Sequence, residues 1–179
     1  TGDGDDLIYA GEGADTIDAG LGKNVIDLSE KINAPDKIKL NYKNNPDDHD
    51  TIYGFVQGVN GDQLDLGEYL DYGVTLLPVI LSSFVPLGSI SDHIIRLAGE
   101  GLVNTIAIED FFRDGQASEN LNLRENKNIL VVSAASQDTG ETQYLFNLVK
   151  LENNYNSFNI AEFYGNSLDI DTWSFENFS

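Results

Sequence analysis

Residues 1–27 are one nine-residue unit written three times: TGDGDDLIY, AGEGADTID and AGLGKNVID. In register, the second and fourth positions are always glycine, the sixth is Asp6, Asp15 or Asn24, and the eighth is always isoleucine. Glycine allows positive φ angles and close backbone approach, whereas a β-branched residue favours a short strand. Each unit therefore predicts a six-residue turn followed by a three-residue strand whose isoleucine points inward.

Two such units make one coil of about 18 residues, with a strand on each side. A single coil cannot bury its two isoleucines, so coils must stack, and stacking brings the glycine turns of alternate units face to face. The carboxylates at the sixth position stack with them and repel each other unless a cation lies between. The repeats therefore predict a parallel β-roll whose folding depends on bound cations.

The donors near these turns are all oxygen atoms, from Asp side chains and turn carbonyls, with no His or Cys in the repeats. Such donors suit a hard cation with a high coordination number, which favours calcium over magnesium or zinc. The candidate metal-site positions are the second, fourth and sixth residues of each unit: Gly2, Gly4, Asp6, Gly11, Gly13, Asp15, Gly20, Gly22 and Asn24.

This pattern resembles the RTX family, whose calcium-binding nonapeptide reads G-G-x-G-x-D-x-U-x. The units depart from it at Thr1, Ala10 and Ala19 in the first position and at Asn24 in the sixth. The resemblance implies Ca²⁺ as the bound ion and a C-terminal module of a bacterial protein exported by a type I system. Modules of secreted metalloproteases, alginate epimerases and RTX adhesins are similar in this respect. Because Asn24 replaces a charged donor with a neutral one, we expect a weaker site there.

Counting same-side turns limits the number of sites. Units one and three lie on the same side, so the turns at Asp6 and Asn24 can close on one ion. Asp15 needs a same-side neighbour one coil away, but residues 28–33 read LSEKIN and lack both glycines. We therefore expect one complete calcium site, at most one further incomplete site, and a position at the end of a longer array.

The charge of the chain is strongly acidic, with 30 acidic and 10 basic residues and a net charge of −20. Within residues 1–27, seven acidic residues face only Lys23, so we expect this segment to be disordered without metal and ordered with it. The same charge opposes binding to nucleic acid and to anionic membranes. The longest apolar stretch, residues 74–87, is interrupted by two prolines and two serines, so we predict no membrane span.

Apolar and polar residues alternate from Asp36 to Lys43, which predicts a half-buried strand. Its polar face carries three lysines: Lys37, Lys39 and Lys43. One interpretation is an edge strand protected by lysines. The alternative is a basic ridge that binds an acidic polysaccharide such as alginate, which would make the chain an accessory carbohydrate-binding or adhesin module.

Residues 50–66, DTIYGFVQGVNGDQLDL, extend the resemblance, because RTX-like modules commonly follow their repeats with an Asp-x-Ile-x-x-Phe strand, a glycine turn and an Asp-x-Ile-Asp-Leu segment. Asp50, Asp62 and Asp65 in this stretch are either turn residues or residues that help to close the roll or bind another ion. Further strands are predicted over 74–85, 93–97, 103–108, 129–134, 143–151 and 158–163, with short helices around 67–70 and 109–112. The predicted fold class is mainly β, with a short parallel β-roll over 1–30 and an antiparallel, β-sandwich-like cap over 31–179.

Catalysis finds little support, because His49 and His93 stand alone and no zinc helix, nucleophile elbow or phosphate loop is present. We expect no enzyme here, with any catalytic activity in an upstream domain. The leading interpretation is a module that stays unfolded in calcium-poor cytosol and folds outside the cell or at its surface. The resemblance implies type I secretion machinery and upstream domains of the same polypeptide as partners. It also implies an uncleaved C-terminal export signal, to which the acidic and aromatic residues 168–179 are suited.

Overall fold

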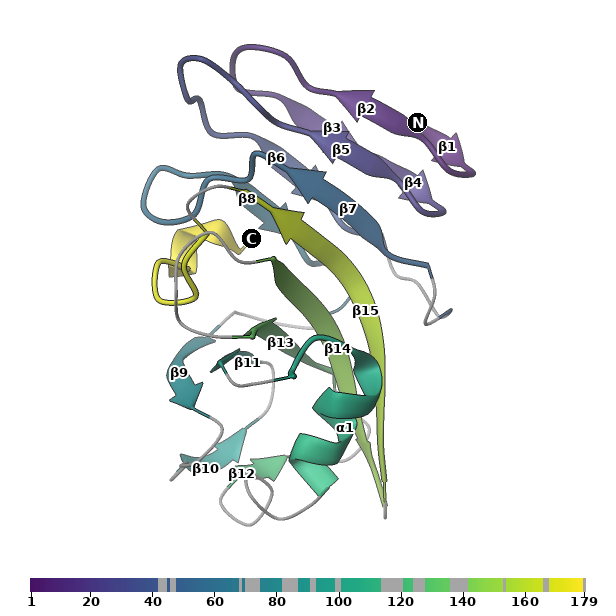
Figure 1. The fold of residues 1–179 in the computed structure, drawn as a ribbon, viewed down its shortest axis with the longest axis vertical. Helices are drawn as coiled ribbons and strands as arrows, with labels where there is room; N and C mark the ends of the chain where they lie inside the picture. The colour runs from purple at the N-terminus through teal and green to yellow at the C-terminus, as the bar shows by residue number, and fades with distance from the viewer. Residues whose placement is uncertain are drawn as a thin grey trace.

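The computed structural model shown in Figure 1 describes residues 1–41, 45, 48–67, 69, 75–81, 87–90, 93–98, 101–113, 121–123, 128–135, 142–152, 154–165 and 168–178. Within these residues the chain is mainly β, and its strands form parallel and antiparallel ladders. The N-terminal coils lie at one end of the elongated molecule, and the single α-helix of the described residues lies near the other (Figure 1).

The N-terminal part is a parallel β-roll with two sheets. One sheet contains β2 (Leu7–Tyr9), β5 (Val25–Asp27) and β7 (Asp50–Tyr53), and the other contains β3 (Thr16–Asp18), β6 (Lys37–Lys39) and β8 (Gln63–Asp65). The turns of units one and three pair in parallel through β1 (Gly2–Asp3) and β4 (Gly20–Leu21). The predicted coil of two units is therefore confirmed.

The core of the roll is built from the eighth position of each unit. The ladders align Ile8 with Ile26 and Ile52 on one side, and they align Ile17, Ile38 and Leu64 on the other. Ile26, Ile38, Ile52 and Leu64 are fully buried. Burying an aliphatic side chain of this size contributes roughly 1.5–3 kcal/mol, so stacking the coils stabilises what no single coil can.

The coil does not stop where the glycine-rich units stop. β6, β7 and β8 continue the same two parallel ladders through residue 65. The division at residue 30 marks the end of the nonapeptides, and the predicted domain boundary there stays a prediction. The strand predicted from Asp36 is present as β6, and the tandem segments of residues 50–66 form the next coil.

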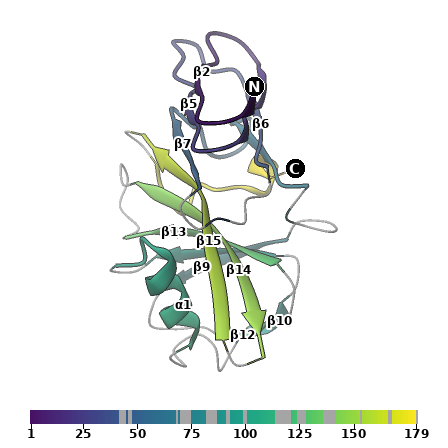
Figure 2. The ribbon, with the colours of Figure 1, turned by 90° about the vertical axis from the view of Figure 1, so that its right-hand side faces the viewer.

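The roll and the C-terminal region share one sheet. β15 (Asn154–Tyr164) pairs in parallel with β7 and antiparallel with β14 (Gln143–Leu151). The sheet then continues through β13 (Asn128–Ala134), β11 (His93–Ala98) and β9 (Thr75–Leu81). A separate parallel pair joins β10 (Leu87–Ile90) to β12 (Leu121–Leu123). Figure 2 shows the coils above the long β14–β15 hairpin.

The helix α1 (Thr105–Arg113) packs against β15 and corrects one prediction. The strand predicted over 103–108 is wrong, whereas the helix predicted around 109–112 is confirmed. Asn104 explains the difference, because its Oδ1 accepts the N–H of Ala107 at 2.9 Å and caps the helix. Ile108 and Phe112 then share the buried face. The other predicted helix, around 67–70, includes Glu68 and Leu70, which lie outside the described residues.

The C-terminal segment closes the far end of the roll. Trp173 is 2% exposed and its ring lies 5.2 Å from the rings of Phe55, Phe163 and Phe178. Phe178 bridges to Leu64 just after the short helix η1 (Phe175–Asn177), so it follows β8 in the second sheet. The mainly β architecture, a roll followed by a cap, is confirmed.

Candidate metal centre

The turns of the first and third units stack directly on each other. Gly4 donates its N–H to the Leu21 carbonyl at 3.1 Å, and Lys23 donates its N–H to Asp5 Oδ1 at 2.8 Å. The register pairs Gly2 with Gly20. The predicted same-side arrangement of these two turns, around Asp6 and Asn24, is therefore present.

Two glycines in this stack have no possible substitute. Gly20 and Gly22 have φ angles of +83° and +110°, in the region that favours glycine. A Cβ at Gly20 would collide with the Gly2 carbonyl, and a Cβ at Gly22 would collide with the Gly4 carbonyl. The turns can approach closely only because both positions lack a side chain, which leaves their carbonyl oxygens as neighbours.

The sixth positions on this side form what we call the asparagine ladder, made of Asp6, Asn24 and Asp50. Asp6 donates its N–H to Asn24 Oδ1 at 3.0 Å, and Asn24 donates its N–H to Asp50 Oδ1 at 3.1 Å. Asn24 Nδ2 also donates to Asp50 Oδ1 at 3.0 Å and to the Gly22 carbonyl at 3.4 Å. The amide of Asn24 therefore provides a donor to the buried Asp50 carboxylate, so these two side chains need no cation between them.

The opposite side carries the aspartate ladder, made of Asp15, Asp36 and Asp62. Asp15 donates its N–H to Asp36 Oδ1 at 2.8 Å, and Asp36 donates its N–H to Asp62 Oδ1 at 2.9 Å. Asp62 Oδ2 accepts the N–H of Val56 at 2.8 Å. The backbone arrangement matches the asparagine ladder, but every member here is a carboxylate. Asp15 thus has a same-side carboxylate neighbour, in contrast to the expectation from sequence.

Glu30 bridges the second glycine turn and the loop that follows the repeats. Its Oε1 accepts the N–H of Gly13 at 2.7 Å, and its Oε2 accepts the N–H of Ala34 at 2.7 Å. Lys31 donates its backbone N–H to Glu12. The loop therefore stacks on the second turn without the two glycines of a nonapeptide, with a carboxylate as the connection.

Two oxygens of the aspartate ladder lack a partner. Asp15 Oδ2 and Asp36 Oδ2 are buried and accept no hydrogen bond from any residue that the structure describes. Leaving a buried acceptor unsatisfied costs about 1–3 kcal/mol, and more for a charged group. Burial, together with the charges of Asp62, Glu30 and Asp15, raises the pKa of Asp36 to about 6, against the opposing effect of the Asp15 N–H. Burial likewise raises the pKa of Asp62.

The chemistry of these donors fits calcium. Among the described residues, no three His, Cys, Asp or Glu side chains form a metal-binding group by themselves. A cation at either stack must therefore take part of its coordination from backbone carbonyls, which the glycine turns supply. Gly4, Gly11 and Gly13, at the predicted positions, have φ angles of +116°, +95° and +105°, as such turns require.

Asp36 is the residue that sequence reasoning missed as part of the stack, whereas Asp62 was already considered there as a turn residue or an ion ligand. The units after residue 30 lose their glycines but keep an Asp two residues before an inward apolar residue, as in Asp36-Lys37-Ile38 and Asp62-Gln63-Leu64. The spacing from Asp15 to Asp36 is longer than the 18 residues of a regular coil, because the loop carries an insertion. The recurring Asp-x-Ile or Asp-x-Leu ending, read without fixed spacing, is the signal that identifies them.

The candidate basic ridge is largely neutralised. Lys37 Nζ lies 3.5 Å from Asp65 Oδ2, and Lys39 Nζ lies 3.5 Å from Asp18 Oδ2. A hydrogen bond from Asn41 lowers the pKa of Asp18 most, burial opposes it as the second largest effect, and the Lys39 charge lowers the pKa further. Lys43 lies outside the described residues.

Comparison with known proteins agrees with the geometry of the N-terminal turns. Residues 1–28 match the family model of the RTX calcium-binding nonapeptide repeat, a model of four copies. These repeats bind Ca²⁺, and residues 1–28 form a calcium-binding module of that type. No curated protein and no solved structure matches the chain significantly. In the part of the chain that the structure describes, no helix is long and apolar enough to cross a membrane.

Proposed function

We propose that this chain, whose residues 1–28 are RTX calcium-binding repeats, is a folding module that orders on calcium binding outside the cell and supports the export and stability of a larger secreted or surface protein. Proteins with RTX repeats are typically secreted by type I systems, which supports this location. Catalysis is no part of the proposal, and any activity of the parent protein is assigned to its other domains.

The observation that carries the proposal is the buried negative charge of the roll. Asp36 and Asp62 are 1% and 2% exposed, and no ion pair of the described residues involves either one or Asp15. Buried carboxylates without cations oppose folding, and the net charge of −20 adds repulsion between the coils. A bound calcium ion removes both penalties, so the roll is expected to form only with calcium.

The consequence reaches beyond the repeats because the roll and the cap share a sheet. β15 takes its place beside β7, and Phe178 takes its place beside Leu64. Both contacts require that the coil containing β7 and β8 is folded. Calcium at about 100 times the dissociation constant adds roughly 2.7 kcal/mol per site, which is a large fraction of the stability of a domain of this size.

Circular dichroism of the full chain tests the proposal. In calcium-free buffer we expect a spectrum with little β structure, and addition of CaCl₂ is expected to produce the β spectrum and a compact hydrodynamic radius. MgCl₂ at equal concentration is expected not to reproduce the change, because magnesium demands a rigid octahedral shell of six ligands. A spectrum unchanged by calcium contradicts the proposal.

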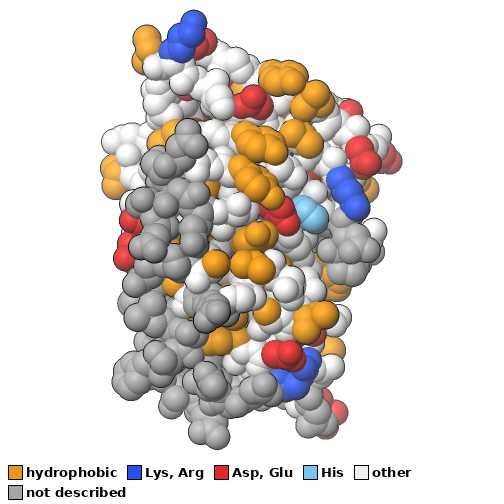
Figure 3. All heavy atoms as spheres, in the orientation of Figure 1, with side chains coloured by type: hydrophobic (Ala, Val, Ile, Leu, Met, Phe, Trp, Pro, Cys, Tyr) orange, Lys and Arg blue, Asp and Glu red, His pale blue; other side chains and the backbone are white. Residues whose placement is uncertain are grey.

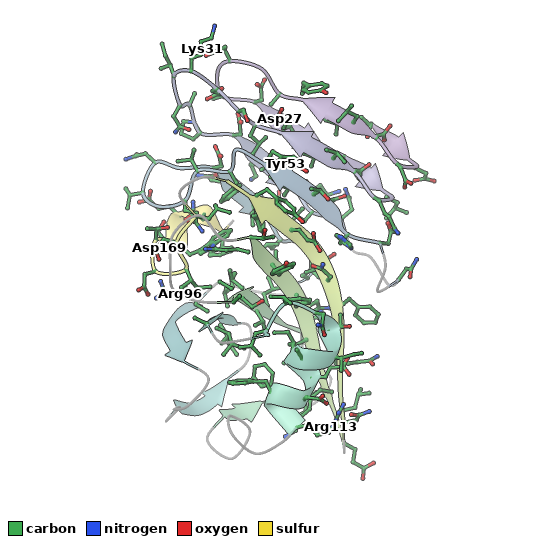
Figure 4. The ribbon with its side chains drawn as sticks, in the orientation of Figure 1. Asp27, Lys31, Tyr53, Arg96, Arg113 and Asp169 are labelled. Carbon is green, nitrogen blue, oxygen red and sulfur yellow. The ribbon has the colours of Figure 1, made fainter. Side chains whose placement is uncertain are left out.

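A second candidate function, glycan binding, is favoured by a row of tyrosines rather than by the lysines. The parallel register aligns Tyr9, Asp27, Tyr53 and Tyr164 in one line across β2, β5, β7 and β15. Tyr9 is 70% exposed and Tyr53 is 42% exposed. Hydrophobic side chains gather over these strands in Figure 3, and Figure 4 shows Asp27 and Tyr53 on neighbouring strands.

The chemistry of this row favours a neutral polysaccharide. Tyrosine rings offer flat apolar surfaces to the faces of sugar rings, and tyrosine hydroxyls can bond to sugar hydroxyls. The hydroxyl of Tyr164 already donates to Glu162 Oε2 at 2.9 Å. The rings of Tyr53 and Tyr164 are already stacked, with centroids 5.3 Å apart and an interplanar angle of 27°. The Asp27 carboxylate between Tyr9 and Tyr53 accepts hydrogen bonds from hydroxyl groups but repels uronate groups. Alginate is therefore disfavoured.

Affinity electrophoresis in gels containing hydroxyethylcellulose or laminarin tests this second function, with alginate gels as the polyanion comparison. We expect calcium-loaded protein to be retarded by at least one neutral glucan and not by alginate. Tyr9→Ala with Tyr53→Ala is expected to abolish the retardation. Ile106→Ala, which removes an equally exposed apolar side chain from α1, is the matched control. Retention by alginate alone contradicts the assignment.

A further inference from the structure

The aspartate ladder contains a feature that the nonapeptide turns do not explain. Asp36 lies outside residues 1–28, is 1% exposed, and has a buried Oδ2 without any hydrogen-bond donor. Asp15 Oδ2, in the turn that Asp36 contacts, is buried and unpartnered as well. Two buried carboxylate oxygens without donors, on residues joined by a 2.8 Å hydrogen bond from the backbone N–H of Asp15 to Asp36 Oδ1, need a positively charged ligand.

The protein itself supplies no such charge in the part of the chain that the structure describes. No ion pair there involves Asp15, Asp36 or Glu30. Lys31, the cationic residue next to Glu30, projects away from the roll at the end of its loop (Figure 4). The backbone donors nearby already have acceptors, since the N–H of Asp15 bonds to Asp36 Oδ1 and the N–H of Gly13 bonds to Glu30.

We propose that a second calcium ion binds between the second glycine turn and the glycine-free loop of residues 28–36. The carboxylates of Asp15 and Asp36 are its side-chain ligands, and backbone carbonyls of the turn 10–15 complete its coordination. Glu30 acts as a positioning residue, because its carboxylate joins the N–H groups of Gly13 and Ala34 and so holds loop and turn together. This inference rests on the proposed calcium dependence and extends it to residues beyond the repeats.

The donor set selects calcium among the available cations. Every candidate ligand is an oxygen, and two of them carry full charges, which excludes thiophilic metals and disfavours those that prefer imidazole. Backbone carbonyls in a loop without regular geometry suit calcium, whose shell is flexible, better than magnesium. The insertion that lengthens the loop is therefore compatible with the site.

The asparagine ladder shows which substitution can test the site without breaking the backbone hydrogen bonds. On the other side of the roll, Asn24 accepts the N–H of Asp6 through Oδ1 and donates through Nδ2 to Asp50. Asp36→Asn preserves the same acceptor for the N–H of Asp15 and provides Nδ2 as a donor to Asp62. The substitution removes the ligand charge but keeps the ladder, so the variant is expected to fold.

Native mass spectrometry and calorimetric titration with CaCl₂, on the full chain, test the site. We expect Asp36→Asn to bind one calcium ion fewer than the natural sequence, or to bind the last ion at least tenfold more weakly. Glu30→Gln is expected to weaken the same ion by a smaller factor without removing it. Glu152→Gln, which removes one exposed carboxylate in the β14–β15 turn, is the matched control for net charge and is expected to change nothing.

The outcomes separate this inference from the broader proposal. If the natural sequence binds no calcium and does not fold with it, the calcium-dependent function itself fails. If the natural sequence binds calcium and Asp36→Asn binds the same number of ions with unchanged affinities, only the second site is overturned. A folded variant is identified by the β spectrum and by the emission of Trp173, which is buried against Phe55 and Phe178. If Asp36→Asn does not fold, the same comparison is made with Asp15→Asn, which leaves the backbone N–H of the ladder in place.

Discussion

The two sides of the roll stack through the same backbone hydrogen bonds but differ in the charges of their ladder side chains. The asparagine ladder and the aspartate ladder have the same backbone hydrogen bonds, since Val25 and Lys37 each donate to the carbonyl of a sixth-position residue at 2.8 Å. They differ in one atom type: Asn24 places an amide nitrogen where Asp36 places a carboxylate oxygen. In the first ladder the Asn24 amide donates to the Asp50 carboxylate, whereas in the second we propose that a cation takes the place of this donor.

This difference explains where calcium matters most. On the asparagine side, stacking depends on glycines that let the turns touch. The Asn24 amide also donates a hydrogen bond to the Asp50 carboxylate of the next coil. On the aspartate side, the loop 28–36 has no glycine, and stacking depends on Glu30 and on the neutralisation of Asp15 and Asp36. Metal dependence is therefore expected to be stronger on the side that looks less like an RTX repeat.

The largest expected effect concerns two glycines at the fourth position of their units, Gly22 on the asparagine side and Gly13 on the aspartate side. Gly22→Ala forces a Cβ into the Gly4 carbonyl and occupies a φ of +110°, so we expect a loss of at least about 3 kcal/mol or failure to fold. Gly13→Ala meets no atom within 4 Å and carries only the strain of a positive φ, about 1–2 kcal/mol. Urea unfolding with saturating calcium measures both. Equal losses contradict the view that only one side stacks by direct contact of turns.

Protonation of the aspartate ladder at low pH is expected to substitute in part for the stabilising effect of calcium. The pKa of Asp36 is raised to about 6 in the folded state, so between about pH 4 and pH 6 the folded state binds more protons than the unfolded chain. Without calcium, the contribution of Asp36 to the free energy of unfolding is therefore fully present below about pH 4. It falls as the pH rises through 6, by at most about 3 kcal/mol. The β structure recovered in calcium-depleted buffer as the pH is lowered from 7 to 4, followed by circular dichroism, measures it. Asp36→Asn is expected to flatten the profile, and an unchanged slope in that variant assigns the effect to other groups.

The reciprocal substitution sharpens the comparison further. Asn24→Asp converts the asparagine ladder into a second run of carboxylates and removes the donor to Asp50. At a limiting calcium concentration, just sufficient to fold the natural sequence, we expect a loss of about 1–3 kcal/mol, because a hydrogen bond is exchanged for repulsion between buried charges. At saturating calcium, tighter calcium binding between the turns of units one and three is expected to recover most of the lost stability. Denaturant titrations at that limiting calcium concentration and at saturating calcium give both values, and a variant that loses stability equally in both conditions contradicts the interpretation.

Sequence alone predicted the roll where local chemistry is periodic. Glycines at fixed positions and one inward isoleucine per unit determine turn, strand and stacking, so the pairing of Gly2 with Gly20 and of Ile8 with Ile26 followed from residues 1–27. The coils after residue 30 were harder to recognise, because insertions change the spacing while Asp36 and Asp62 keep their role.

Long-range contacts were beyond the sequence patterns. Nothing in residues 154–164 indicates that β15 pairs with β7, over a hundred residues earlier, because a half-buried strand has the same alternation wherever it pairs. The helix α1 was obscured because residues 103–108 are rich in β-branched residues, as strands are, and the hydrogen bond of Asn104 at the helix start favours a helix. The burial of Trp173 in the closing segment likewise depends on partners from β7, β15 and the end of the chain.

The smallest expected effect concerns the lysines next to the aspartate ladder. Lys37 and Lys39 lie one and three residues after Asp36, and each pairs at 3.5 Å with a partly exposed carboxylate outside the ladder. Exposed ion pairs of this kind contribute about 0–1 kcal/mol. The double variant Lys37→Ala, Lys39→Ala is therefore expected to lose less than about 1 kcal/mol and to bind the same number of calcium ions as the natural sequence. If instead calcium affinity rises strongly in that variant, the lysines already neutralise the ladder, and the contrast between its two sides rests on them rather than on Asn24.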